Sequence, residues 1–139
     1  MTHDAYSTKR VTVWPEDRNL VPGFAIKYPD GHISWCPADV FSRDYQPLNA
    51  LSFGHAVHAL KQGKRVARAG WNGKGTFLFL VPGSTFKVNR PPLLGIYPEG
   101  TEVQYHAHID MKTATGEVVP WLASQSDVLA DDWMILGEV

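Results

Sequence analysis

Residues 52–69 read SFGHAVHALKQGKRVARA, a helix pattern followed at once by a strand pattern. Ser52 suits the position before a helix, because its hydroxyl can accept a hydrogen bond from a free amide of the first turn. Apolar residues then recur at helical spacing up to Leu60, and Gly63 stands where helices commonly end. The sequence therefore predicts a helix after Ser52 that leads into a strand over residues 64–69.

Downstream of this stretch the pattern is mostly that of antiparallel strands, with turn residues separating short apolar or alternating runs. The proline-rich residues 89–101 exclude a helix or a central strand, since proline lacks a backbone N–H, and we expect an ordered loop there. We expect strands over residues 76–81, 102–111, 117–121 and 133–136, and a short helix over residues 127–130 capped by Ser124 or Ser126.

Upstream, a second hairpin pattern precedes this region. Phe24, Ile26 and Tyr28 stand at alternate positions, and Pro29-Asp30-Gly31 then favours a turn. Pro37 suits the first turn of a short helix over residues 38–45. An N-terminal extension with a β-hairpin and a short helix is therefore expected to come before the main domain.

These patterns together predict an α+β protein. We expect a small, mostly antiparallel domain over residues 51–139, with two or three short helices in the chain, preceded by the extension over residues 1–50. With 44% hydrophobic residues among 139, a packed core is expected rather than disorder. The single cysteine, the lack of a long apolar run and the lack of a leader pattern predict a soluble protein of a reducing compartment, with no membrane partner.

Charge is unevenly distributed along the chain. The net charge of −1 argues against a general DNA or RNA binder. Residues 45–98, however, contain no acidic residue and seven cations, so this span is +7 and the remainder −8. Such segregation can focus a local field on a small anion, although a basic surface paired with acidic segments elsewhere in the fold would produce the same pattern.

Two tryptophans stand in sequence surroundings that suit a ligand. Trp71 opens a glycine-rich turn in which it could stack on a base, Asn72 could hydrogen-bond a base or ribose, and Lys74 could neutralise a phosphate. Trp121 precedes a capped helix start, where Ser124 and Asp127 offer polar contacts and Asp127 suits a ribose hydroxyl or base amine better than a phosphate. The alternative for both tryptophans is a place in the core.

A third pattern is His106-Ala107-His108-Ile109-Asp110. On a strand the two histidines and Asp110 would face one side, and such a set can bind a divalent metal. A hydrogen-bonded or surface histidine pair is the alternative, because the glutamate that would complete a cupin motif is absent. No nucleophile elbow, phosphate loop or dinucleotide fingerprint is present, so the residues alone favour binding over catalysis.

Many short motifs, in order, resemble the Thoeris anti-defense 2 family of phage and prophage proteins over about residues 51–136. The matching runs are Val66-Ala67-Arg68, Gly70 to Gly75, Phe77 to Ser84, Val88 to Leu93, Tyr97 to Thr101, His108 to Lys112, Pro120 to Gln125, Asp127 to Ala130 and Asp132-Trp133.

The resemblance implies a homotetramer in the cytoplasm of the infected bacterial host. It would sequester glycocyclic ADP-ribose, the signal made by bacterial TIR proteins, and some members also bind cyclic dinucleotides. It further implies that Trp71 and Trp121 stack on the ligand, and that the protein has no catalytic residues and no cofactor. From their chemistry, we expect polar ligand contacts at Asn72, Lys74, Asn89, Arg90, Ser124 and Asp127.

Two other functions stay open at this point. One is a metal-dependent enzyme that uses His106, His108 and Asp110. The other is a virion-associated interaction module that uses the edge of the N-terminal hairpin to dock a partner strand. Residues 1–50 precede the part of the chain that resembles the family, and their sequence does not indicate a function.

Overall fold

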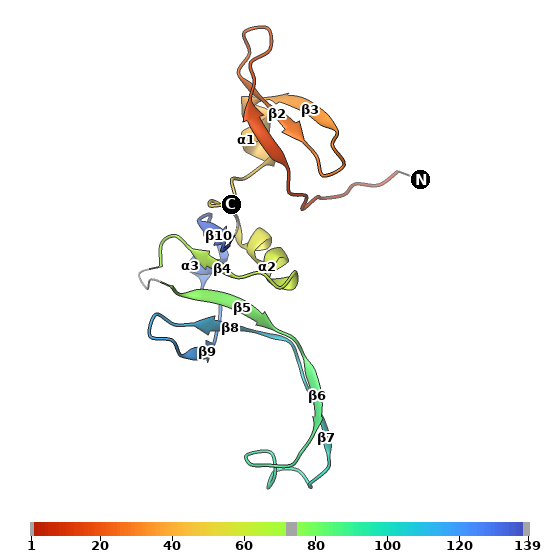
Figure 1. The fold of residues 1–139 in the computed structure, drawn as a ribbon, viewed down its shortest axis with the longest axis vertical. Coiled ribbons are helices and arrows are strands. Elements are labelled where there is room, and N and C mark those ends of the chain that lie inside the picture. The colour runs from red at the N-terminus through yellow and green to blue at the C-terminus, as the bar shows by residue number, and fades with distance from the viewer. Residues whose placement is uncertain (1, 72–74, 138–139) are drawn as a thin grey trace.

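The computed structural model describes residues 2–71 and 75–137. Its elements form three parts along one long axis: an N-terminal unit, a central domain and a two-stranded arm (Figure 1). The sheets are antiparallel and the described helices are short, which confirms the α+β fold class. In the described part of the chain, no helix has the length and apolar character needed to cross a membrane.

The N-terminal unit is a three-stranded sheet with one helix. Its strands lie in the order β1-β2-β3. The ring of Phe41 stacks on Phe24 at 4.3 Å and on Tyr45 at 5.0 Å, and this aromatic stack joins the helix to the sheet. The elements are β1 (Thr12–Pro15), β2 (Gly23–Lys27), β3 (Ile33–Pro37) and α1 (Ala38–Asp44).

The central domain consists of a five-stranded sheet in the order β10-β4-β5-β8-β9, with α2 packed on one face. The elements are α2 (Phe53–Lys61), β4 (Val66–Arg68), β5 (Phe77–Val81), β8 (His108–Lys112), β9 (Val118–Pro120), α3 (Gln125–Val128) and β10 (Trp133–Ile135). The buried core between helix and sheet consists of Leu51, Ala56, Ala59, Leu60, Val66, Leu78 and Trp133.

The predicted helix after Ser52 is confirmed. The Ser52 hydroxyl accepts a hydrogen bond from the backbone amide of His55, and Gly63 adopts a φ of 82° where the chain turns out of the helix. Just before the helix, Leu51 exchanges backbone hydrogen bonds of 2.8 and 3.1 Å with Trp133. The start of the central domain is thereby fastened to its last strand.

The arm consists of β6 (Ser84–Lys87) and β7 (Glu102–Tyr105). The prediction of one strand over residues 102–111 is wrong, because β7 and β8 are separate, and β6 was not expected. Pro82 has no N–H for the ladder, and a Cβ at Gly83 would lie 2.8 Å from the Tyr105 carbonyl oxygen. The pairing of β5 with β8 therefore ends at this point, and the two chain segments continue in a new direction as the paired strands β6 and β7 (Figure 1).

The loop over residues 88–101 closes the far end of the arm. Val88 is only 1% exposed; its amide donates to the Thr101 carbonyl oxygen at 2.9 Å, and its carbonyl oxygen accepts from the Gly100 amide at 2.8 Å. Further backbone bonds join Leu94 to Arg90 and Tyr97 to Leu93. The prediction of an ordered loop is therefore confirmed.

Candidate functional site

Trp133 is the centre of an aromatic cluster in the central domain. Its side chain is 1% exposed, and its indole N–H donates to the Asp127 carbonyl oxygen at 2.9 Å. The ring of Trp71 meets it edge-on at 5.4 Å, and the ring of Trp121 meets it edge-on at 6.2 Å. Phe53 from α2 packs against both Trp121 and Trp133. The two tryptophans proposed as stacking residues thus contact the same buried ring.

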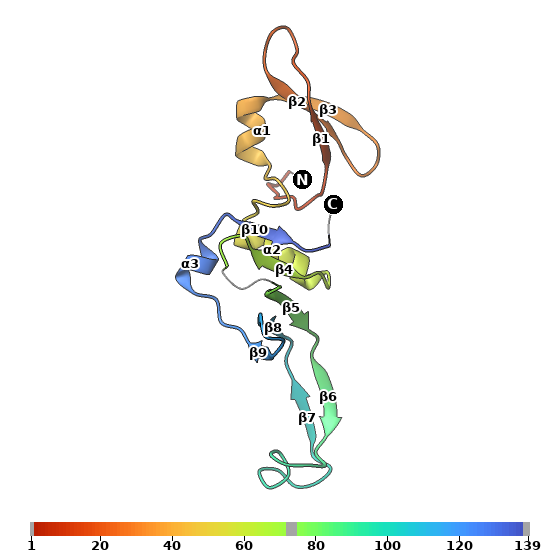
Figure 2. The same cartoon turned by 60° about the vertical axis from the view of Figure 1, so that its left-hand side comes forward.

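The chain brings these tryptophans together from different parts of the sheet. Trp71 follows β4, and its amide donates to the Arg68 carbonyl oxygen at 3.2 Å. Trp121 follows β9 at the far edge, and its amide donates to the Ile109 carbonyl oxygen at 3.1 Å. The segment after Trp121 then returns past the sheet to α3 and β10 (Figure 2). Both indoles are only partly buried, so each keeps accessible surface.

Arg68 connects the two tryptophan-bearing segments. Its guanidinium donates to Asp132 through Nε and to Asp127 through one terminal nitrogen, each at 2.9 Å. The other oxygen of Asp132 accepts the Gly70 amide at 2.8 Å, next to Trp71. The Arg68 side chain is 19% exposed, so water screens these pairs only in part. Sequence reasoning assigned no role to Arg68, Asp132 or Trp133.

Asp127 and Ser124 form a capping box at the start of α3. The Asp127 amide donates to the Ser124 hydroxyl oxygen at 3.1 Å, while one Asp127 carboxylate oxygen accepts both the Ser124 amide at 3.1 Å and its hydroxyl at 2.8 Å. The prediction of a cap at Ser124 is confirmed. Both residues were expected to contact ligand, and here their polar atoms already have partners within the chain.

Electrostatics keep both carboxylates of this network ionised. Burial opposes ionisation of Asp127, but hydrogen bonds from the Ser124 amide, Arg68, the Ser124 hydroxyl and Trp71 outweigh it and lower the pKa of Asp127. The hydrogen bond from Arg68, opposed by burial and supported by the Gly70 amide, likewise lowers the pKa of Asp132. Both carboxylates are therefore ionised and hydrogen-bonded at neutral pH, and the network is suited to hold Trp71 in place.

The structure places two of the four remaining predicted ligand residues, Asn89 and Arg90, away from this cluster. Asn72 and Lys74 lie outside the described residues. Asn89 and Arg90 are exposed at the start of the loop over residues 88–101, at the opposite end of the arm from the sheet (Figure 1). Within the described part of a single copy, no contact joins those two residues to Trp71 or Trp121.

The proposed metal set does not assemble. β7 ends before His106 and β8 begins at His108, so His106 lies outside both strands. Its carbonyl oxygen lies 3.2 Å from the His108 ring nitrogen Nδ1. The other ring nitrogen of His108 lies 3.4 Å from Asp110. Within residues 2–71 and 75–137, no group of three or more His, Cys, Asp or Glu side chains is placed to hold a metal ion. The structure thus shows a histidine–carboxylate pair at this position.

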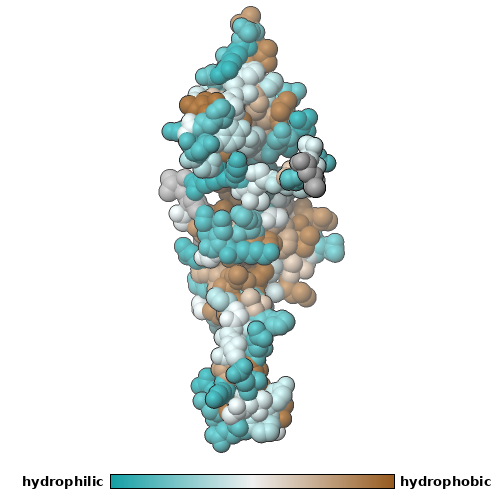
Figure 3. Space-filling model, turned by 90° about the vertical axis from the view of Figure 1, so that its right-hand side faces the viewer, coloured by the Kyte–Doolittle hydropathy of each residue, from teal (hydrophilic) through white to brown (hydrophobic). Residues whose placement is uncertain are grey.

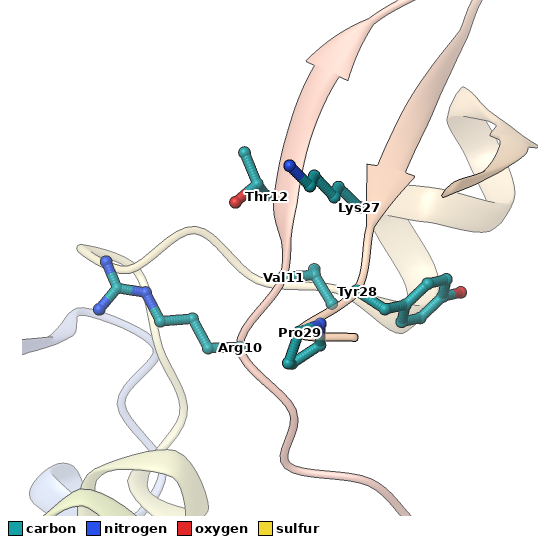
Figure 4. A pocket seen from close by; sticks show the side chains of 6 residues that line it. All are labelled: Arg10, Val11, Thr12, Lys27, Tyr28 and Pro29. Atoms are coloured by element: carbon teal, nitrogen blue, oxygen red, sulfur yellow. The ribbon is translucent and has the colours of Figure 1, made fainter. Parts of the chain in front are cut away.

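An open hollow of about 480 Å³ lies on the N-terminal unit, outside the central domain. In Figure 4 the Lys27 ammonium group points toward Thr12, whereas the Tyr28 ring points away from them. The hollow is lined by Arg10, Val11, Thr12, Lys27, Tyr28 and Pro29. None of the predicted site residues that the structure describes lines the hollow, and neither Trp71 nor Trp121 is part of it.

Comparison with known proteins identifies a family that covers the central domain and the arm. Residues 51–136 match the Thoeris anti-defense 2-like domain. A protein of Bacillus phage SP01, named Thoeris anti-defense 2, is 42% identical over 87 residues, which span 63% of this chain and 96% of the phage protein. The matched region contains Trp71, Trp121 and Trp133 together with the whole Arg68 network. The chain therefore belongs to the Thoeris anti-defense 2 family.

Proposed function

We propose that this chain is a phage anti-defense protein that binds and sequesters a cyclic nucleotide signal in the cytoplasm of the infected host. The observation that carries the proposal is the 42% identity to the phage protein over 96% of that protein's length. The ligand suggested by the family resemblance is glycocyclic ADP-ribose, with cyclic dinucleotides as the second candidate. A protein of this kind acts by mass action and releases the signal unchanged.

The aromatic cluster supports this proposal. A stacking side chain has to be held in a defined orientation while part of its surface stays open to the ligand. Trp71 and Trp121 meet both conditions, because each packs edge-on against the buried Trp133 and each remains partly exposed. Each stacked base contributes on the order of 1–3 kcal/mol, which corresponds to about a ten- to a hundredfold change in affinity.

We also propose that the chain works as a homo-oligomer, with a tetramer suggested by the resemblance. Large apolar side chains are exposed from the first residue of β9 to the residue after α3: Val118 is 55% exposed, Leu122 91% and Leu129 74%. Hydrophobic surface is visible on the middle of the molecule in Figure 3. Such surfaces in soluble proteins commonly mark interfaces. A second copy would also be needed to bring Asn89 and Arg90 to the tryptophans.

The test is a retention experiment on the full chain. The protein is mixed with a panel of cyclic nucleotides that includes glycocyclic ADP-ribose, free ligand is removed, and the heated protein releases what it had bound. We expect an intact cyclic nucleotide from the wild type and loss of retention in Trp71→Ala and Trp121→Ala. Trp14→Ala is the matched control, because Trp14 lies on β1 and is 36% exposed.

Two results would contradict the proposal. Full retention by both Trp71→Ala and Trp121→Ala, with folding checked by circular dichroism, would show that the cluster is not the site. A linearised or hydrolysed product that accumulates with time beyond one equivalent per site would show that the protein is an enzyme. Mixing the wild type with each nucleotide for increasing times, followed by chromatography, measures both.

A further inference from the structure

One edge of the N-terminal sheet is formed by β3, and no described strand lies beyond it. The Tyr28 amide donates to the His32 carbonyl oxygen at 2.9 Å, and the register continues from this pair without a shift along β2 and β3. Hydrogen-bonded and non-hydrogen-bonded pairs alternate in an antiparallel ladder. The backbone N–H and C=O groups of Ile33 and Trp35 therefore point away from β2, toward the open edge.

Proline occupies outward positions on two other sheet edges. On β1, the Glu16 amide donates to the Gly23 carbonyl oxygen at 2.9 Å, so Val13 and Pro15 are the outward residues. Pro120 takes the same kind of position on β9. Proline has no N–H, and a proline at such a position hinders the pairing of an edge with another strand. The edge of β3 instead keeps the N–H groups of two successive outward residues.

The side chains of this edge suit pairing with a like strand. Residues 33–36 read Ile-Ser-Trp-Cys and carry no charge, so two such strands do not repel each other. Ile33 is a large apolar side chain that is 51% exposed. Trp35 is partly buried, and its indole N–H donates to the Glu16 carbonyl oxygen, so its ring is already held in one orientation. These features favour a second copy of the same strand as the occupant of the edge.

We propose that β3 pairs with β3 of a second copy of the chain, antiparallel and with Ser34 at the two-fold axis. Ile33 of each copy then lies opposite the partner's Trp35, and every outward N–H and C=O of both residues finds a hydrogen-bond partner. A register with Trp35 on the axis would place Ile33 opposite the partner's Pro37, which cannot donate, and would leave a carbonyl unpaired. The chosen register also covers Ile33 with an aromatic ring, a favourable cross-strand pair.

This contact lies outside residues 51–136, the part of the chain that matches the family. It does not depend on the proposed function, because none of its residues belongs to the central domain. A two-fold contact closes on itself and joins the copies in pairs. Residues 1–50 thus gain a role as a second linkage between copies, in addition to any contact that the central domain makes.

The first experiment tests the register in the full chain with a disulfide. Opposite residues of a non-hydrogen-bonded antiparallel pair have Cα atoms about 4.5 Å apart, which is within the range for a disulfide. Ser34→Cys in a Cys36→Ser background should therefore give a covalent dimer on mild oxidation, seen on a non-reducing gel. Ser42→Cys in the same background is the matched control, because Ser42 is an exposed serine on α1. If Ser34→Cys links no more than the control, the proposal is overturned.

The second experiment measures the mass of the full chain by light scattering at micromolar concentration. Ile33→Pro removes an outward donor without removing a hydrogen bond to β2, so it should halve the mass of the assembly. Val13→Pro is the matched control at the other edge of the same sheet and should leave the mass unchanged. Circular dichroism checks the folding of both variants.

Equal masses for the wild type and Ile33→Pro, or an equal loss in Val13→Pro, would overturn the pairing and would leave the edge to an extended segment of another protein. Leu122→Asp, a change in the central domain, should leave the disulfide link through Ser34→Cys intact. Loss of that link in Leu122→Asp would overturn the independence of this contact from the central domain.

Discussion

Replacing Arg68 with methionine removes both ion pairs of the network while keeping most of the aliphatic side chain in place. The guanidinium makes two hydrogen bonds of 2.9 Å to carboxylates, and its side chain is 19% exposed. Hydrogen bonds to charged groups contribute about 1.5–3 kcal/mol each when they are shielded from water. Asp127, with its side chain 13% exposed, would keep its hydrogen bonds from Ser124, which offsets part of the loss.

We therefore expect the free energy of unfolding to fall by about 2–4 kcal/mol in Arg68→Met, between the values for one and two such bonds. For a domain of this size that corresponds to a melting temperature lower by roughly 10–20 °C. Thermal unfolding followed by circular dichroism measures the change. The matched control is Arg90→Met, because Arg90 is exposed in the loop over residues 88–101 and has no ion pair among those of the described chain.

The network also makes a prediction about the site. Arg68 holds Asp132, whose carboxylate accepts a hydrogen bond from the Gly70 amide next to Trp71. Arg68→Met should therefore loosen the packing of the Trp71 indole and broaden its NMR signals. Tryptophan side-chain NMR signals, recorded below the melting temperature, report on this. If Arg68→Met melts like Arg90→Met and keeps wild-type indole signals, the reasoning from the ion pairs is refuted.

Three further predictions concern acid stability, the bend of the arm and assembly. Folding lowers the pKa of Asp127 and of Asp132, so their contribution to stability is complete above the ordinary carboxyl pKa of about 4 and is lost as the pH falls through the lowered values. Acid melts should therefore be steeper for the wild type than for Arg68→Met, and parallel curves would contradict this. Gly83→Ala would place a Cβ 2.8 Å from a backbone oxygen of β7, so we expect a lower melting temperature and faster amide exchange in the arm; wild-type exchange would show that the bend has room. Leu122→Asp places a charge on a side chain that is 91% exposed in one copy, so light scattering should show smaller assemblies than for the wild type. A wild-type protein that is already a monomer at micromolar concentration would count against a shared site.

Local patterns in the sequence predicted most helices and strands, because the interactions that start and stop them lie within a few residues. Ser52 caps α2 through an amide three residues away, and Ser124 and Asp127 cap α3 over the same separation. The strand prediction over residues 102–111 was wrong for a different reason. The interruption between β7 and β8 lies opposite Gly83 and arises from the neighbouring strand, so no residue within 102–111 predicts it.

The family resemblance also came from short motifs, and the comparisons confirm it over residues 51–136. The assignment of Trp71 and Trp121 to a ligand stays a prediction. What the sequence could not supply is their common packing partner. Trp133 was expected only as the start of a strand, although its buried ring is the surface that both tryptophans contact.

The sequence by itself determined the α+β class, the caps, the turns and the family, all of which depend on neighbouring residues. The tertiary structure alone decided which distant residues meet. Arg68 lies 64 positions from Asp132, and only the pairing of β4 with β10 brings them within 2.9 Å. The order of strands likewise brings Arg65, just before β4, and Lys112 of β8 to the ring of Phe77 on β5, which lies between those two strands. The physical reason is that strand order depends on burying the whole core at once, and no local stretch of sequence encodes that.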